Sequence, residues 1–115
     1  MKQTYPTFIL NVNDGSKYPF LAYVPDMEIF TEGETFTDAI RMARDAIGST
    51  GVSMEDNREE ISAPSDQIAA IKACQHTAEV DFSKGVLTYL DVDFTEYRKQ
   101  LARLQSKKMW SFQAG

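Results

Sequence analysis

Between residues 8 and 12, hydrophobic side chains recur at every second position. This spacing predicts a half-buried β-strand. Asp14 and Gly15 follow, and they predict a two-residue hairpin because type I′ turns need positive φ angles. Residues 18–24 then have the pattern of a returning strand. The first part of the chain therefore predicts two antiparallel strands joined by a tight turn.

A third strand is predicted over residues 28–32. Pro25 and Asp26 bend the chain before it, because proline fixes φ and has no backbone N–H to donate. Gly33 closes the strand. Three strands joined by short connections predict an antiparallel meander.

Residues 35–57 have the periodicity of an amphipathic helix that lies on one face of the sheet. Thr35 is the expected N-cap. The apolar stripe recurs at intervals of three and four residues and consists of Phe36, Ala39, Ile40, Ala43 and Ile47. A second, shorter helix is predicted over residues 67–74, with either Ser65 or Asp66 as its cap.

Two further strands are predicted over residues 78–82 and 86–94, on either side of a turn at residues 83–85. From Phe94 onward the apolar spacing changes from alternation to a helical period. This change predicts a C-terminal helix of two to three turns.

The expected fold class is α+β, with an antiparallel sheet of three to four strands, one main helix on one face and a short C-terminal helix. The chain has 115 residues, of which 43% are hydrophobic and 25% charged, as in one ordinary globular domain. We assign residues 1–98 to the α+β domain and residues 99–115 to a short basic helix or tail.

Charge is distributed unevenly around a net value of −5. Residues 95–110 contain five basic residues and one acidic residue, so this segment carries +4 and the rest of the chain carries −9. The net charge argues against general phosphate binding, which needs a basic face. An acidic body with a short basic end is a different matter. It suits binding to a basic protein, and it equally suits a soluble body with a solvated helix face.

The sequence predicts a cytoplasmic protein without a cofactor or a structural metal. No apolar run has the length of a signal peptide or of a membrane span, so no membrane contact is expected. The single cysteine, Cys74, has no internal disulfide partner and is expected to be a small buried hydrophobe. His76 has no partner at a metal-binding spacing and is expected at the surface or in a hydrogen bond.

Asp91 and Asp93 are the candidates for metal chemistry, because alternate residues of a strand point to the same face. With Asp26 or Glu32 they would be able to hold Mg²⁺, as in a metal-dependent nuclease. The other interpretation, which we favour, is a solvent-facing polar edge with no catalytic residue.

Three segments resemble the HicB family of antitoxins. Residues 23–47 combine a strand, a proline–aspartate bend, a short strand, a glycine turn and a capped helix, and residues 61–65 and 92–98 continue the resemblance. It covers most of residues 18–98. The resemblance implies a partial RNase H-like fold and an antitoxin that occludes a small, basic, RNA-cleaving toxin of the HicA type. It also implies that this toxin has a double-stranded-RNA-binding fold.

The partner-binding residues that we expect lie in the bend at residues 25–26 and on or near the helix predicted over residues 35–57. They are Pro25, Asp26, Asp45, Glu55, Asp56, Glu59 and Glu60. Fuller members of the family carry a C-terminal DNA-binding module after the segment that resembles residues 91–98. Residues 99–115 are too few for such a module, so autorepression is not expected of this chain alone.

The basic C-terminal segment has three possible roles. It packs on its own sheet, it pairs with a second copy in a dimer or tetramer, or it contacts nucleic acid weakly. The last role would use Arg98, Lys99, Arg103, Lys107, Lys108 and the ring of Trp110. An oligomeric module without a toxin partner therefore remains the alternative function.

Overall fold

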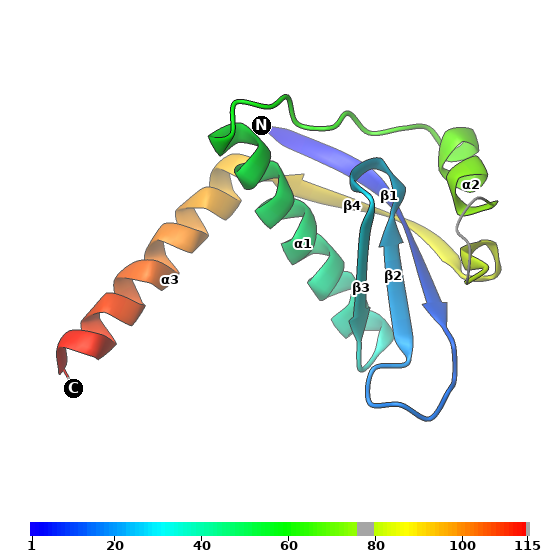
Figure 1. The fold of residues 1–115 in the computed structure, drawn as a ribbon, viewed down its shortest axis with the longest axis horizontal. Coiled ribbons are helices and arrows are strands. Elements are labelled where there is room, and N and C mark those ends of the chain that lie inside the picture. The colour runs from blue at the N-terminus through cyan, green and yellow to red at the C-terminus, as the bar shows by residue number, and fades with distance from the viewer. Residues whose placement is uncertain (76–79, 115) are drawn as a thin grey trace.

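The computed structural model describes residues 1–75 and 80–114, and its centre is a four-stranded antiparallel sheet. The strands are arranged in the order β3-β2-β1-β4 (Figure 1). They are β1 (Lys2–Asn11), β2 (Phe20–Val24), β3 (Ile29–Gly33) and β4 (Val86–Asp93). The predicted α+β fold with an antiparallel meander is confirmed.

Helix α1 (Phe36–Asp56) packs across one face of this sheet. Thr35 caps it as predicted, since its Oγ1 accepts a hydrogen bond from the Asp38 N–H at 3.0 Å. The predicted apolar stripe forms the main core, in which Ala39, Ala43 and Ile47 are fully buried. The sheet contributes Tyr5, Ile9, Ala22, Val24, Leu90 and Val92 to the same core.

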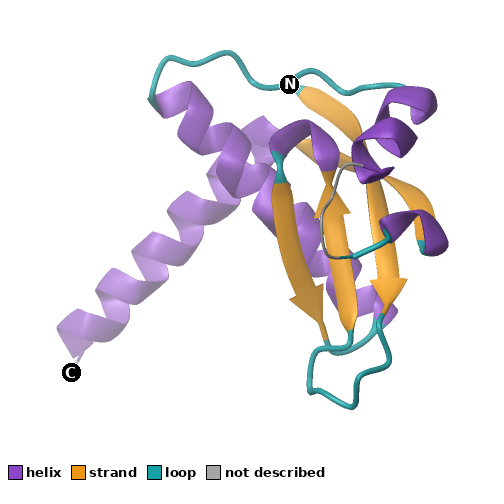
Figure 2. Ribbon diagram, turned by 45° about the vertical axis from the view of Figure 1, so that its right-hand side comes forward, coloured by secondary structure: helices purple, strands orange, loops and turns teal. Residues whose placement is uncertain are grey.

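The opposite face of the sheet is covered at one end by α2 (Gln67–Gln75) and the 3₁₀ helix η2 (Phe82–Lys84), as Figure 2 shows. Ala70 and Cys74 of α2 pack there against Phe8 and Tyr23. Burial, and secondarily the charge of Asp81, raise the pKa of the Cys74 thiol to about 11. The prediction that Cys74 is a buried hydrophobe is confirmed.

The cap of α2 is Asp66, one of the two residues that the sequence left open. Its Oδ1 accepts a hydrogen bond from the Ala69 N–H at 2.8 Å. His76 lies just beyond this helix and outside the described residues.

The predicted two-residue hairpin at Asp14 and Gly15 is wrong, because the ladder between β1 and β2 ends at the pair Asn11–Phe20. The connection is therefore a longer loop. Gly15 does have a positive φ of 76°, but Asp14 Oδ1 accepts the Ser16 N–H at 3.0 Å. Such local side-chain hydrogen bonds satisfy the backbone in place of ladder pairing.

The predicted strand over residues 78–82 is wrong in its described part. Residues 80 and 81 are irregular, Phe82 begins η2, and residues 78 and 79 lie outside the described residues. Strand β4 pairs with β1 instead of with a preceding hairpin arm. What we call the second core cluster consists of Phe8, Tyr23, Ala70, Cys74 and Phe82. The apolar side chains of Val80 and Phe82 alternate because Phe82 belongs to this cluster and Val80 packs against it.

Helix α3 (Phe94–Ala114) is longer than the predicted two to three turns, since its 21 residues make about six turns. It begins beside α1 and then extends away from the sheet (Figure 1). Asp93 accepts hydrogen bonds from the Thr95 and Glu96 N–H groups at 3.0 and 3.3 Å, so it caps the helix. No helix in the described part of the chain is long and apolar enough to cross a membrane.

Candidate partner-binding surface

Asp26, one of the predicted partner-binding residues, holds two loops together. It follows Pro25 in the short 3₁₀ helix η1 (Pro25–Met27), and its Oδ2 accepts the Ser65 N–H at 2.9 Å. Nearby, the Tyr5 hydroxyl donates to the Ser62 carbonyl oxygen at 2.7 Å. Burial, and secondarily the charge of Asp26, raise the pKa of Tyr5 to about 12. The loop after α1 is thus fastened to the body at two points.

Three more of the predicted partner-binding acids hold α3 against α1. Asp45 Oδ1 accepts a hydrogen bond from the Tyr97 hydroxyl at 3.0 Å. The Arg98 guanidinium lies 3.0 Å from Asp56 and 3.8 Å from Glu55. Desolvation, followed by the hydrogen bond to Asp45, raises the pKa of Tyr97 to about 12. These acids therefore have an internal role that the sequence did not reveal.

Close packing between α1 and α3 depends on two glycines. A Cβ atom at Gly48 would overlap the ring of Tyr97, and one at Gly51 would overlap the ring of Phe94. Neither glycine interrupts α1, because the tertiary contact outweighs their low helix propensity. The junction between α1 and α3 is fixed by packing as well as by charge.

Glu59 and Glu60 are the remaining predicted acids, and both are exposed in the loop that follows α1. Within the described part of the chain, neither carboxylate takes part in an ion pair. They are available for long-range attraction of a basic partner. Their contact with a partner remains a prediction.

The basic residues predicted for weak nucleic-acid contact are divided between internal pairs and solvent. Arg98 pairs with α1, and Arg103 lies 3.5 Å from Glu96 in its own helix. Lys99 is exposed. The side chains of Lys107, Lys108 and Trp110 lie outside the part that the structure describes. The described cations of α3 are thus partly neutralised by acids of the same chain.

Asp91 and Asp93 are exposed and face cations. Asp91 lies 3.2 Å from the Lys2 ammonium and 3.8 Å from Arg44. The hydrogen bond from Lys2 lowers the pKa of Asp91, and the backbone N–H of Glu96 lowers that of Asp93. Among residues 1–75 and 80–114, no three His, Cys, Asp or Glu side chains are grouped as metal ligands.

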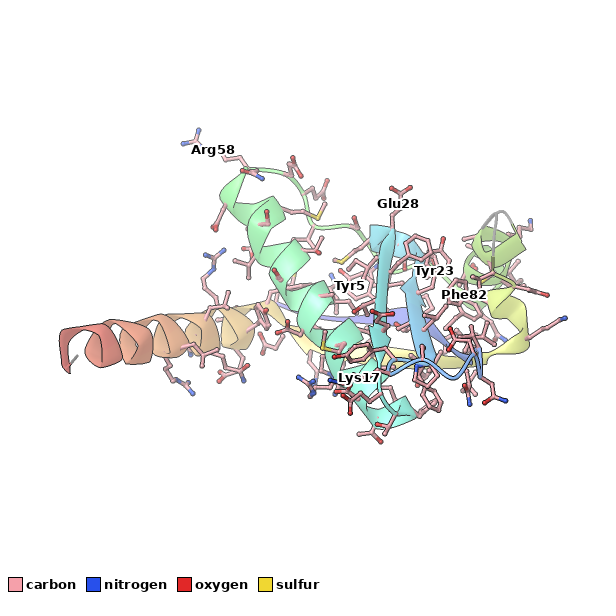
Figure 3. The ribbon with its side chains drawn as sticks, turned by 60° about the horizontal axis from the view of Figure 1, so that its bottom comes forward. Tyr5, Lys17, Tyr23, Glu28, Arg58 and Phe82 are labelled. Carbon is pink, nitrogen blue, oxygen red and sulfur yellow. The ribbon has the colours of Figure 1, made fainter. Side chains whose placement is uncertain are left out.

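An aromatic surface at the β3 edge was not predicted from the sequence. Phe30 is 59% exposed, although its ring stacks on Tyr23 with a centroid distance of 4.6 Å and an interplanar angle of 17°. Phe82 of η2 lies 5.1 Å from Tyr23 and 6.1 Å from Phe30, measured between ring centroids. Figure 3 shows Tyr23 and Phe82 side by side. Only the register that pairs Phe30 with Tyr23 reveals this stack.

Two acidic residues flank Phe30. Glu28 precedes β3 with a φ of 52° and points away from the body (Figure 3), and Glu32 is exposed near the other end of the strand. In the described residues neither carboxylate belongs to an ion pair. An open hollow of about 750 Å³ next to Glu32 is also lined by Glu34, Asp38 and Arg41. We call Phe30, Glu28 and Glu32 the Phe30 surface.

The fold has a counterpart among solved structures. It is similar to a chain of the "Toxin-Antitoxin complex from Streptococcus pneumoniae", with a TM-score of 0.67 and 25% sequence identity. The match covers 84% of this chain and 73% of that chain. A toxin–antitoxin complex thus contains a chain of this fold. No family model and no curated protein matches the sequence.

Proposed function

We propose that this chain is the antitoxin of a toxin–antitoxin pair, of the HicB kind, and that it neutralises a small RNA-cleaving toxin of the HicA kind. The observation that carries the proposal is the structural similarity to a chain of a toxin–antitoxin complex over 84% of this chain. The resemblance of residues 23–47, 61–65 and 92–98 to HicB antitoxins points the same way.

The proposed mechanism is steric and electrostatic. An acidic body attracts a basic toxin, docks on its RNA-binding face and prevents access of the RNA. The proposal assigns no catalytic step, cofactor or metal to this chain. We propose that the complex forms in the cytoplasm.

Co-expression tests this proposal. The chain would be produced together with the small protein encoded beside its gene, and growth and complex formation would be measured. We expect the neighbouring protein alone to arrest growth, and this chain to restore growth and purify with it in a stoichiometric complex. A neighbouring protein that is harmless and does not bind would contradict the proposal.

One observation favours a second function, an oligomeric module without a toxin. Leu104 is 56% exposed on the part of α3 that extends beyond the body, and this apolar position would be covered if two copies paired. Light scattering on the purified chain tests it. A dimer that Leu104→Lys converts to a monomer, combined with no toxin binding, would favour this alternative over the antitoxin.

A further inference from the structure

We propose that the Phe30 surface is the point at which this chain binds an arginine or lysine side chain of its basic toxin partner. The inference rests on the proposed function and specifies where the partner docks. It concerns a different part of the molecule from the acids of α1, three of which already hold α3.

The ring of Phe30 is both exposed and held in place. It stacks on Tyr23, and Phe82 supports it from a third element. Tyr23 and Phe82 are only 7% and 2% exposed, so the stack is anchored in the second core cluster. One face of the Phe30 ring lies against Tyr23, and the side chain remains 59% exposed. A ring that is already ordered loses little entropy when a partner covers it, and such aromatic anchors dominate binding energies.

Charge around the ring indicates the chemistry of the occupant. Glu28 and Glu32 stand on either side of Phe30, and neither is neutralised by a cation within the described residues. Other acids of the body already form ion pairs. An example is Asp38, whose Oδ1 lies 2.6 Å from a guanidinium nitrogen of Arg41. A guanidinium or ammonium group over the aromatic face would gain a cation–π contact and an ion pair together. RNA would be repelled by the same carboxylates.

The position of β3 makes the surface accessible and argues against a second copy as the occupant. As the outer strand of the sheet, β3 is reachable without displacing any other element. If two copies met at this edge, the carboxylates of Glu28 and Glu32 would approach those of the other copy. Like charges in such contacts destabilise an interface, whereas a basic toxin supplies the complementary charge.

The test is a titration of the purified toxin partner with three variants of the full chain. Phe30→Leu keeps the apolar volume but removes the ring, and E28Q/E32Q removes the two charges. Val86→Ala is the matched control, because Val86 is 53% exposed on β4 at the opposite edge of the sheet. Thermal unfolding of each variant checks that the fold is retained.

We expect Phe30→Leu to raise the toxin Kd roughly 2- to 30-fold, the range from an exposed to a desolvated cation–π contact. E28Q/E32Q should weaken binding and reduce its dependence on salt, while Val86→Ala leaves Kd unchanged. Wild-type Kd values in Phe30→Leu and E28Q/E32Q would overturn this inference and leave the antitoxin function intact. A wild-type chain that binds no toxin would overturn both. A dimer of the free chain that Phe30→Leu dissociates would identify a second copy as the occupant and also overturn it.

Discussion

At position 51 of α1, the absence of a side chain allows the buried ring of Phe94 to pack against the helix backbone. A Cβ atom there would overlap the ring, which is only 1% exposed and enclosed by the main core. The usual effect of replacing a helical glycine by alanine is a stabilisation of roughly 1 kcal/mol. Here the packing conflict should reverse the sign.

Gly51→Ala should therefore lower the free energy of unfolding by about 1–3 kcal/mol, as overpacking of a core does. Ser53→Ala, at an exposed position two residues further along the same helix, is the control and should stay within about 0.5 kcal/mol of the wild type. Urea denaturation measures both. A stabilised Gly51→Ala variant would show that α3 is not packed against α1 at this point.

Tyr5 and Tyr97 make stability depend on pH in the alkaline range. Their folded-state pKa values are raised from 10.0 to about 12, chiefly by burial. The folded state thus favours the neutral phenol. Its contribution to stability is complete below pH 10 and is lost as pH rises towards 12. The free energy of unfolding should fall across this window, and Y5F/Y97F should fall less steeply. Equal slopes for the variant and the wild type would refute this assignment.

At the scale of elements, the sequence predicted the parts whose periodicity is decided by burial. The meander, α1 and the start of α2 were predicted because their apolar positions face a core and their caps are local. The prediction of a strand over residues 78–82 was wrong because alternation is not specific to strands. Val80 and Phe82 also alternate, but they pack against the second core cluster from an irregular segment and a 3₁₀ helix. The length of α3 was missed because, among its described side chains, only Phe94 is buried, so burial imposes little pattern on them.

Substitution of Thr35 tests whether the N-cap that the structure shows contributes to the stability of α1. Its side chain accepts the Asp38 N–H, while the Asp38 carboxylate accepts the Glu34 N–H at 2.9 Å. Thr35→Ala should cost about 1 kcal/mol in the free energy of unfolding. Thr37→Ala, two positions later and exposed, lacks this role and should be nearly neutral. Equal effects of the two substitutions in thermal or urea unfolding would argue against the cap.

The candidate site was predicted only in part, because tertiary contacts decide which of its residues are free. Composition revealed an acidic body, but it did not reveal which acids are already paired. Asp45, Glu55 and Asp56 lie far from Tyr97 and Arg98 in the sequence, and only the packing of α3 on α1 brings them together. The stacked aromatic rings at the β3 edge likewise depend on strand register and on η2.

At the scale of the whole molecule, the negative charge of the acidic body should govern the rate of association with a basic partner. Glu59 and Glu60 are exposed and not used in ion pairs within the described chain, so their reversal changes the field without releasing α3. E59K/E60K should slow association with the toxin several-fold at low salt and leave dissociation nearly unchanged. Stopped-flow kinetics at low and physiological ionic strength measure this. An unchanged association rate at low salt would remove the steering role.

The most direct test of the central claim is inhibition of RNA cleavage by purified components. The proposed toxin, which is the small protein encoded beside this gene, would be incubated with RNA while this chain is added in increasing amounts. The account predicts that cleavage falls linearly and stops at a stoichiometric ratio, because each bound chain occludes one RNA-binding face. Cleavage that continues undiminished in the presence of excess chain would contradict the assignment of this protein as an antitoxin.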